Sequence, residues 1–394
     1  MKINLMLPTL LFISSINSGQ AQVNNQKYGF IDHISKAIEK DTSEWRYQSG
    51  AVNYSFVGDY RNSLASWDKA ISKKDYKPSA SDSLILASAY IQNAKDYILQ
   101  RSKNEKILII NEAHHNPKHR TFTRSLLKEL YNNGYRYLGL EAISDTAVNK
   151  RNYAIQSSGY YTAEPEFGNL IHEAKNLGFT IFGYEASTGK NGKEREIEQA
   201  KNIHEFMKLN NDGKYLIHCG FDHVYENAVK NWEKAMAGRL KEYSGIDPLT
   251  IDQVKLSEHS KASLNHYFLN STREKEPFIL KKTDDTLLNV LNEPRQTDIQ
   301  IIHPPTEFKN ERPTWISHDK KEYWIAKDRL KKYTYPVQIM AFRHLEYENE
   351  GIPADIIELK GYKTNKPLYL QSGKHMIVVR NDSYEVIDKF VIAE

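Results

Sequence analysis

The sequence predicts an α/β protein with a parallel sheet core flanked by helices, a helical region before it and a small β region after it. In the central part of the chain, short apolar runs alternate with amphipathic stretches, the pattern of strand–helix–strand units. Before the core, apolar residues recur at three- and four-residue steps, which indicates helices. We therefore divide the chain into 1–21, 22–102, 103–335 and 336–394.

The first segment has the features of a signal peptide. Lys2 precedes an apolar stretch over 5–16, and the small residues Gly19 and Ala21 follow. This pattern predicts that 1–21 is removed and that the mature chain is periplasmic or secreted. A buried helix is the alternative for this stretch, which is too short to span a bilayer, and no later stretch approaches that length. No membrane span is expected.

Composition narrows the class of protein. The 394 residues carry 54 basic and 50 acidic side chains, with a net charge of +4 and no dense basic run. A nucleic-acid partner is therefore not expected. The single cysteine, Cys219, excludes an internal disulfide and is expected to be a buried, inert thiol. A small molecule or a peptide is the expected partner.

The region 22–102 should be helical. Residues 53–70 read as a helix, a tight turn at Gly58-Asp59 and a second helix, which resembles one tetratricopeptide-type hairpin. A lone hairpin of this kind cannot form a peptide-binding array, so we expect a packing role. Further on, apolar residues fall on one helical face: Leu84, Ala87, Ile91, Ala94 and Ile98.

The core should contain parallel strands. They are expected at 106–110, 137–140, 180–184 and 215–217, with possible additions at 251–256 and 299–302. Two helices between them should end at Gly134 and Gly178, where a left-handed cap favours glycine. The last region should form β strands at 337–342, 356–359, 367–370, 376–380 and 386–391, with turns at Gly373 and Asn381-Asp382.

Acids and imidazoles follow the core strands. Since the carboxyl ends of parallel strands meet at one edge of a sheet, these side chains should lie together. Each alone has a plainer explanation, such as a helix cap, an ion pair or a structural histidine. Together they suit general acid–base chemistry near neutral pH, or a divalent cation. The set is Glu112, His114, Glu141, Glu185, His218 and His223, and His303 follows a later strand.

Four ordered motifs carry a family resemblance. They are Asn111-Glu112-Ala113-His114, Leu140-Glu141-Ala142, the helix that begins with Arg195-Glu196, and Gly220-Phe221-Asp222-His223. They resemble the erythromycin esterase, ChaN and Tiki superfamily, which has a parallel α/β core. The resemblance covers about 106–256 and extends toward 342. The first motif departs from the family because Asn111 stands where glycine is usual, so a tight turn at that position is in question.

The branches of this superfamily imply different activities. The esterase branch implies that His114 is a general base on water, that Glu112 and Glu141 orient it, and that Arg195 or His223 steadies an oxyanion. The Tiki branch implies a divalent metal held by His114, Glu141 and His223, in a peptidase. The ChaN branch implies haem binding without catalysis.

We therefore expect a hydrolase acting on an ester, lactone or peptide bond, with water as nucleophile. His114 is the expected base, Glu112 and Glu141 orient it, and four further participants are expected: Glu185, Arg195, His218 and His223. A haem-binding protein is the main alternative, and a scaffold with a degenerate site that contacts an envelope protein is a third. His115 and His119 are expected to be solvated surface residues.

Overall fold

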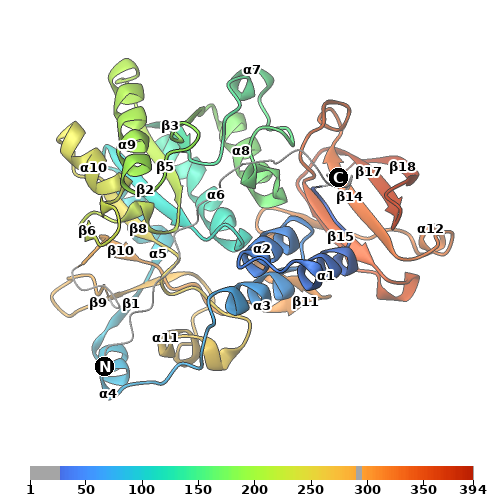
Figure 1. The fold of residues 1–394 in the computed structure, drawn as a ribbon, viewed down its shortest axis with the longest axis horizontal. Helices are drawn as coiled ribbons and strands as arrows, with labels where there is room; N and C mark the ends of the chain where they lie inside the picture. The colour runs from blue at the N-terminus through green and yellow to red at the C-terminus, as the bar shows by residue number, and fades with distance from the viewer. Residues whose placement is uncertain (1–26, 290–294, 394) are drawn as a thin grey trace.

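The computed structural model describes residues 27–289 and 295–393 (Figure 1), so the predicted signal peptide lies outside the described residues. A six-stranded sheet forms the core of the described chain, in the order β10-β8-β2-β5-β3-β4. All of its pairings are parallel, as the sequence predicted. The strands are β2 (Ile107–Glu112), β3 (Tyr135–Leu140), β4 (Thr180–Gly183), β5 (Lys214–Gly220), β8 (Leu249–Asp252) and β10 (Ile299–Gln300).

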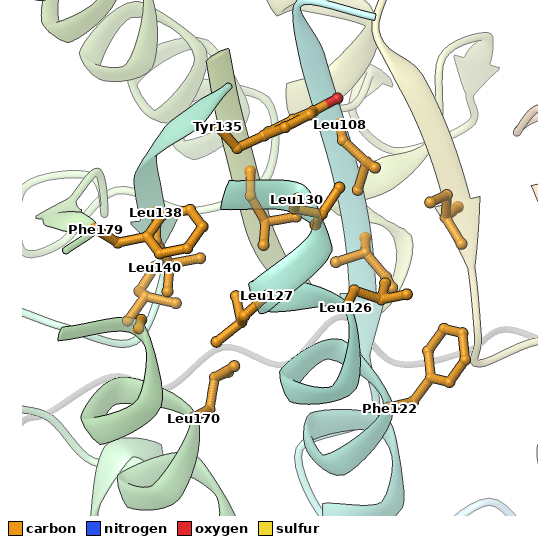
Figure 2. Packing of buried hydrophobic residues seen from close by; sticks show 14 of the residues in the cluster. Leu108, Phe122, Leu126, Leu127, Leu130, Tyr135, Leu138, Leu140, Leu170 and Phe179 are labelled. Carbon is orange, nitrogen blue, oxygen red and sulfur yellow. The ribbon is translucent and has the colours of Figure 1, made fainter. Parts of the chain in front are cut away.

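Helices cover both faces of this sheet. α6 (Pro117–Asn132) and α8 (Pro165–Leu177) pack on one face, where they bury apolar side chains of β2 and β3 (Figure 2). α9 (Gly192–Leu209) and α10 (Met236–Ser244) pack on the other face. Strand side chains alternate between the two faces, so every residue of β2 is buried although neighbours point in opposite directions.

Local sequence signals set the ends of the helices. Glu164 caps the start of α8 by accepting from the Phe167 N–H at 2.8 Å, and Pro165 takes the first helical position. Gly178 ends α8 with φ +98°, and Gly134, just after α6, has φ +94°. Both are left-handed conformations that glycine adopts without a Cβ clash, so the two predicted helix ends are confirmed.

The N-terminal hairpin forms as predicted. α1 (Ile31–Lys40) precedes α2 (Arg46–Phe56) and α3 (Tyr60–Ala70). Gly58 has φ +72°, and the Asp59 side chain accepts from the Asn62 N–H at 3.2 Å to cap α3. A left-handed glycine followed by an aspartate cap is the physical basis of the tight turn.

The predicted helical face from Leu84 to Ile98 is wrong. The stretch divides into α4 (Ala80–Ser88), β1 (Tyr90–Asn93) and α5 (Ala94–Ser102). β1 pairs antiparallel with β9 (Phe278–Lys281), a strand far away in sequence. Leu84 is 68% exposed, whereas Ile98 is buried. The backbone pairing with β9 therefore overrides the local helical period.

The C-terminal region is a four-stranded antiparallel sheet in the order β15-β14-β17-β18. Its strands are β14 (Val337–Arg343), β15 (Asp355–Leu359), β17 (Lys374–Asn381) and β18 (Val386–Ala393), and beside it β13 (Lys321–Tyr323) pairs with β16 (Leu368–Leu370). α1 and α2 pack on one face of this sheet, for example through Phe56 against Phe342 and Ile356. The first helices of the described chain and the C-terminal sheet therefore lie side by side (Figure 1).

Short elements complete the described chain: α7 (Val148–Arg151), α11 (Tyr267–Ser271), α12 (Lys327–Leu330), β6 (Ala228–Val229), β7 (Glu233–Lys234), β11 (Phe308–Lys309) and β12 (Arg312–Pro313). Within residues 27–289 and 295–393, no helix combines the length and the apolarity that crossing a membrane requires.

Candidate active site

The predicted residues converge at the carboxyl edge of the sheet. Glu112 ends β2 and lies in register with Gly220 at the end of β5. Glu141 follows β3 and Glu185 follows β4, and these four strands are neighbours in the order β2-β5-β3-β4. Arg195 joins them from the first turn of α9. The sheet topology therefore brings chain segments that are far apart in sequence to one place.

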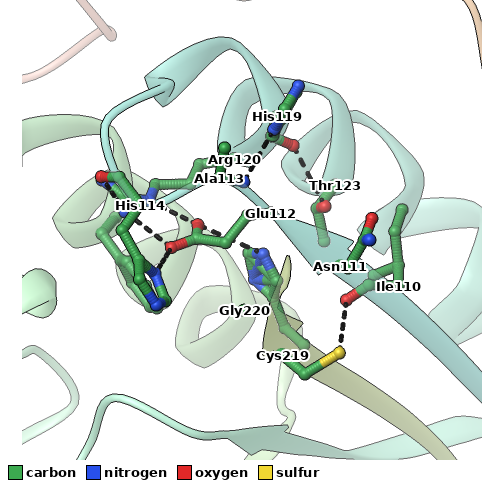
Figure 3. A network of polar contacts seen from close by, with 12 residues as sticks. Ile110, Asn111, Glu112, Ala113, His114, His119, Arg120, Thr123, Cys219 and Gly220 are labelled. Carbon is green, nitrogen blue, oxygen red and sulfur yellow. Dashed lines mark hydrogen bonds and ion pairs between the residues drawn. The ribbon is translucent and has the colours of Figure 1, made fainter. Parts of the chain in front are cut away.

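Glu112 and His114 form a buried carboxylate–imidazole pair (Figure 3). His114 Nδ1 lies 2.9 Å from Glu112 Oε1. Arg120, one helical turn into α6, donates from Nε and Nη2 to the two oxygens of Glu112, both at 2.6 Å. Burial alone would raise the pKa of Glu112, but Arg120 and His114 hold it far below its usual range. Glu112 is therefore a carboxylate, and it accepts the Nδ1 proton of His114.

Arg120 is itself held by a second carboxylate. Its Nη1 donates to Glu164 at 3.0 Å, and its Nη2 also donates to the His114 carbonyl at 2.9 Å. Burial raises the pKa of Glu164 to about 7, against the lowering effect of Arg120. Sequence reasoning did not identify Arg120 or Glu164 as site residues. The signals were an arginine eight residues after Glu112 and a glutamate directly before Pro165.

The other edge of the His114 ring faces Gly220 and Glu141. A Cβ built on Gly220 would lie 2.6 Å from His114 Nε2 and 3.4 Å from Glu141 Oε2, so the imidazole packs closely against Gly220 because glycine has no side chain. Tyr161 stacks on the His114 ring, with centroids 3.8 Å apart and planes 14° from parallel. The ring is therefore fixed in orientation, with Nε2 against Gly220 on the side of Glu141.

Arg195 links Glu141 to Glu185. Its Nη2 donates to Glu141 Oε1 and to Glu185 Oε2, each at 2.5 Å, and its Nε donates to Glu185 Oε1 at 2.9 Å. Glu141 also accepts from the Gly220 N–H at 2.6 Å. Burial alone would raise the pKa of Glu141, but His223 and Arg195 lower it to about 2. The Glu185 side chain is 38% exposed, compared with 7% for Glu141, so the site reaches solvent on the Glu185 side.

His223 forms a second carboxylate–imidazole pair. Its Nδ1 lies 2.7 and 2.8 Å from the two oxygens of Glu196, and its Nε2 lies 2.8 Å from Arg195 Nη1 and 3.5 Å from Glu141 Oε1. Burial would lower the pKa of His223, but Glu196 and Glu141 raise it above its usual value. The Arg195 contact requires an unprotonated Nε2, whereas the carboxylates favour a protonated ring. The contacts with Arg195 and with the carboxylates therefore favour opposite protonation states of His223.

Asn111 supports the turn that carries His223. Phe221, the first residue of the short 3-10 helix Phe221–Val224, has φ +41°, a conformation that a bulky side chain disfavours. Its carbonyl accepts from Asn111 Nδ2 at 2.8 Å, and the same amide donates to Asp252 at 2.9 Å. The left-handed backbone conformation therefore occurs at Phe221 and not at Asn111. The Asn111 side chain stabilises it by donating to the Phe221 carbonyl.

His218 lies on the α6 and α8 side of the sheet. Its Nε2 is 3.3 Å from Glu112 Oε2, and its ring stacks on Phe167 with centroids 5.6 Å apart. Burial lowers the pKa of His218 to about 4, although the Glu112 carboxylate opposes the shift. The His218 side chain therefore points into the layer between the sheet and these helices, where it contacts Glu112. It does not belong to the group of Glu141, Glu185 and His223 that contacts Arg195.

The His218 pKa predicts a pH-dependent stability. The unfolded chain binds a proton at His218 near pH 6.5 and the folded chain only near pH 4, so folding stability falls as the pH drops through this interval. One proton changes the slope by up to about 1.4 kcal/mol per pH unit. Urea unfolding of His218→Gln between these pH values should show a shallower loss of stability than wild type. His344→Gln, at a half-buried position, is the control, and equal slopes in wild type and His218→Gln would contradict the prediction.

The neighbouring histidines are structural. The prediction that His115 and His119 are surface residues is wrong, because both are buried. His115 stacks on Trp67, and His119 Nδ1 accepts from the Ala113 N–H at 3.0 Å. His303, another buried residue, contacts Gln253 at 3.0 Å. Cys219 is a buried free thiol, as predicted, and burial raises its pKa well above the usual value.

A shared metal ion does not fit this arrangement. The Arg195 guanidinium occupies Nε2 of His223 and Oε1 of Glu141, two of the atoms that would face an ion. Within residues 27–289 and 295–393, no group of three or more His, Cys, Asp or Glu side chains is arranged to hold one. Two members of the predicted set, Glu141 and His223, therefore bind the same cationic side chain.

Comparison with known proteins finds only weak structural similarity. No family model matches the sequence, and no curated protein matches it. Among solved structures, the type III effector HopBA1 is similar over 55% of this chain and 98% of its own, with 13% identity and a TM-score of 0.34. RRSP, a MARTX toxin effector domain from Vibrio vulnificus, is similar over 58% of this chain and 49% of its own, with 19% identity and a TM-score of 0.30. At these TM-scores the similarity says nothing about what the chain does.

Proposed function

We propose that the chain is an exported hydrolase in which His114 activates water for attack on an ester, lactone or peptide carbonyl. The observation that carries the proposal is the fixed His114 ring. Nδ1 is bound to Glu112, which Arg120 keeps ionised, while Nε2 lies against Gly220 on the side of Glu141. A carboxylate-oriented imidazole with one free nitrogen is the arrangement that general-base catalysis requires. The resemblance to the erythromycin esterase branch agrees with this role.

Each group then has a role in the reaction. His114 Nε2 takes a proton from water as the water oxygen bonds to the carbonyl carbon, and Glu112 stabilises the resulting imidazolium. Arg195, the cation at the solvent side of the site, balances the charge that develops on the carbonyl oxygen. When the bond to the leaving group breaks, that group receives a proton from His114 or His223. Glu141 and Glu185 keep Arg195 in place.

The test is turnover of a mixed panel of esters, macrolactones and peptides by the purified full chain. Wild type and His114→Ala are compared, each with and without a chelator. Loss of turnover in the variant supports the proposal, and insensitivity to chelator agrees with the position of Arg195. Absence of turnover in wild type, or equal turnover in both proteins, would overturn it.

Gly220→Ala should disable the site without removing any functional group. The added Cβ would lie 2.6 Å from His114 Nε2, so the imidazole must move away from residue 220. Misplacement of a catalytic group by about 1 Å can lower the rate roughly 100-fold. We expect a comparable fall in kcat in steady-state assays. Gly361→Ala is the matched control, because nothing lies within 4 Å of its added Cβ, and similar kcat values for the two variants would contradict the prediction.

Haem binding remains the alternative prediction from the resemblance. A haem ligand would be an imidazole or phenolate. Both ring nitrogens of His223 have partners, Glu196 and Arg195, and the His114 ring stacks on Tyr161 with Nδ1 bound to Glu112. Titration of the full chain with haem, followed by absorbance in the Soret region, decides between the readings. A saturable shift that His114→Ala abolishes would favour haem binding.

A further inference from the structure

Trp67 joins the N-terminal hairpin to the site. It lies on α3, and its half-buried ring stacks on His115 with centroids 4.2 Å apart and planes 14° from parallel. Phe221 also stacks on Trp67, at 5.3 Å and 19°. Trp67 therefore contacts the loop that follows β2 and the turn that follows β5, the two segments that carry His114 and His223.

Phe221 transmits this contact to the candidate catalytic groups. Its ring meets the His114 ring edge to face, with centroids 5.1 Å apart and planes at 87°. Its backbone has φ +41° and begins the short 3-10 helix that contains His223. A disfavoured conformation of this kind persists only when the surroundings hold it. Trp67 and the Asn111 side chain are contacts that hold Phe221.

α3 is fixed firmly enough to act as such a support. The Ser63 hydroxyl contacts the His115 carbonyl at 2.7 Å, and the Tyr60 hydroxyl lies 3.1 Å from Asn116 and 2.8 Å from Glu258. All of these groups are buried. The hairpin is therefore bound to the β2 loop by direct polar contacts as well as by the aromatic stack.

We propose that Trp67 is a positioning residue for this site, acting through Phe221 on His114 and His223. This inference rests on the proposed hydrolase function. It assigns the N-terminal hairpin the role of orienting the candidate catalytic side chains. The ring of Trp67 keeps Phe221 in its left-handed conformation. Without the ring, the turn relaxes and the two imidazoles lose their mutual orientation, although substrate contacts remain.

Steady-state kinetics of the full chain test this role. Trp67→Leu keeps apolar bulk but removes the stack, and we expect kcat to fall about tenfold or more with KM changed less than about twofold, since orientation affects the chemical step. Trp67→Phe restores an aromatic ring and should recover most of kcat. Trp45→Ala, at a 36% exposed tryptophan before α2, is the control. Wild-type kcat in Trp67→Leu would overturn the proposal, as would a loss of kcat that Trp67→Phe does not recover.

Two further measurements distinguish a positioning role of Trp67 from misfolding of the variant and from failure of the proposed hydrolase function. Because Trp67 acts through Phe221, the double variant Trp67→Leu/Phe221→Ala should lose no more kcat than Phe221→Ala alone, and additive losses would overturn the proposal. Histidine-selective NMR titration of the full chain needs no turnover. The His223 titration midpoint should move in Trp67→Leu and stay unchanged in Trp45→Ala. An unmoved midpoint would refute positioning even if wild type proves active, and a moved one would support it even if no panel substrate is hydrolysed.

Discussion

Arg120→Met is expected to destabilise the folded chain by about 3–5 kcal/mol, the typical effect of removing one partner from a buried ion pair. The Arg120 side chain is fully buried and contacts Glu112 on one side and Glu164 on the other. Methionine fills much of the same volume but leaves both carboxyl groups without their cation. The loss therefore comes mainly from the uncompensated charge of Glu112 and not from a cavity, because burial raises the pKa of Glu164 to about 7 even with Arg120 present.

Urea unfolding at neutral pH measures this effect. Arg101→Met is the matched control, since Arg101 pairs with Glu105 at 2.8 Å but has a 41% exposed side chain, and exposed pairs contribute only about 0–1 kcal/mol. Adding Glu112→Gln to Arg120→Met should recover part of the stability because it removes one buried charge. A loss below about 1 kcal/mol for Arg120→Met would contradict the assigned role of Arg120.

Arg195→Met should lower kcat/KM about 100- to 1000-fold, the range seen when one oxyanion-stabilising donor is removed. Arg195 is the cation that contacts Glu141, Glu185 and His223 together. Its loss removes the positive charge beside the carbonyl oxygen of the bound substrate. It also removes the guanidinium that donates to Glu141. Arg195→Lys retains the charge but lacks the planar fork, so it should recover only part of the activity.

The control for Arg195 is another cation of the same chain segment. Lys190→Met removes a surface lysine that pairs with Glu198, just before α9, and should leave kcat/KM within about twofold of wild type. Steady-state kinetics on a hydrolysed panel substrate give both values. Full activity in Arg195→Met would contradict the charge-balancing role.

The sequence predicted the core because its signals are local or periodic. Buried strands contain continuous apolar runs, such as 107–110 in Ile107–Glu112, and the glycines after α6 and α8 mark the helix ends. Parallel pairing then brings the strand ends together, so Glu112, Glu141, Glu185 and the residues after β5 could be expected at one edge. The strands near the C-terminus were also predicted from local apolar runs and turn residues, whereas their antiparallel pairing comes from the structure.

The sequence could not predict contacts that depend on distant segments. Arg120, which fixes Glu112, looks like an ordinary polar position on an amphipathic helix. Glu196 belongs to the third motif, but its contact with His223 depends on how α9 packs against the turn after β5. Trp67 meets Phe221 only because α3 packs on the β5 turn. The pairing of β1 with β9 is equally non-local, and it converted part of the helix predicted around Ile91 into a strand.

The most direct test of the central claim is chemical rescue of His114→Ala by free imidazole on a hydrolysed panel substrate. The substitution opens space between Glu112 and Gly220 where the ring was. If His114 is the general base, kcat of the variant should fall about 100- to 10,000-fold and rise in proportion to added imidazole, with a pH dependence that follows free imidazole. Wild-type turnover in the variant without imidazole would contradict the proposed function.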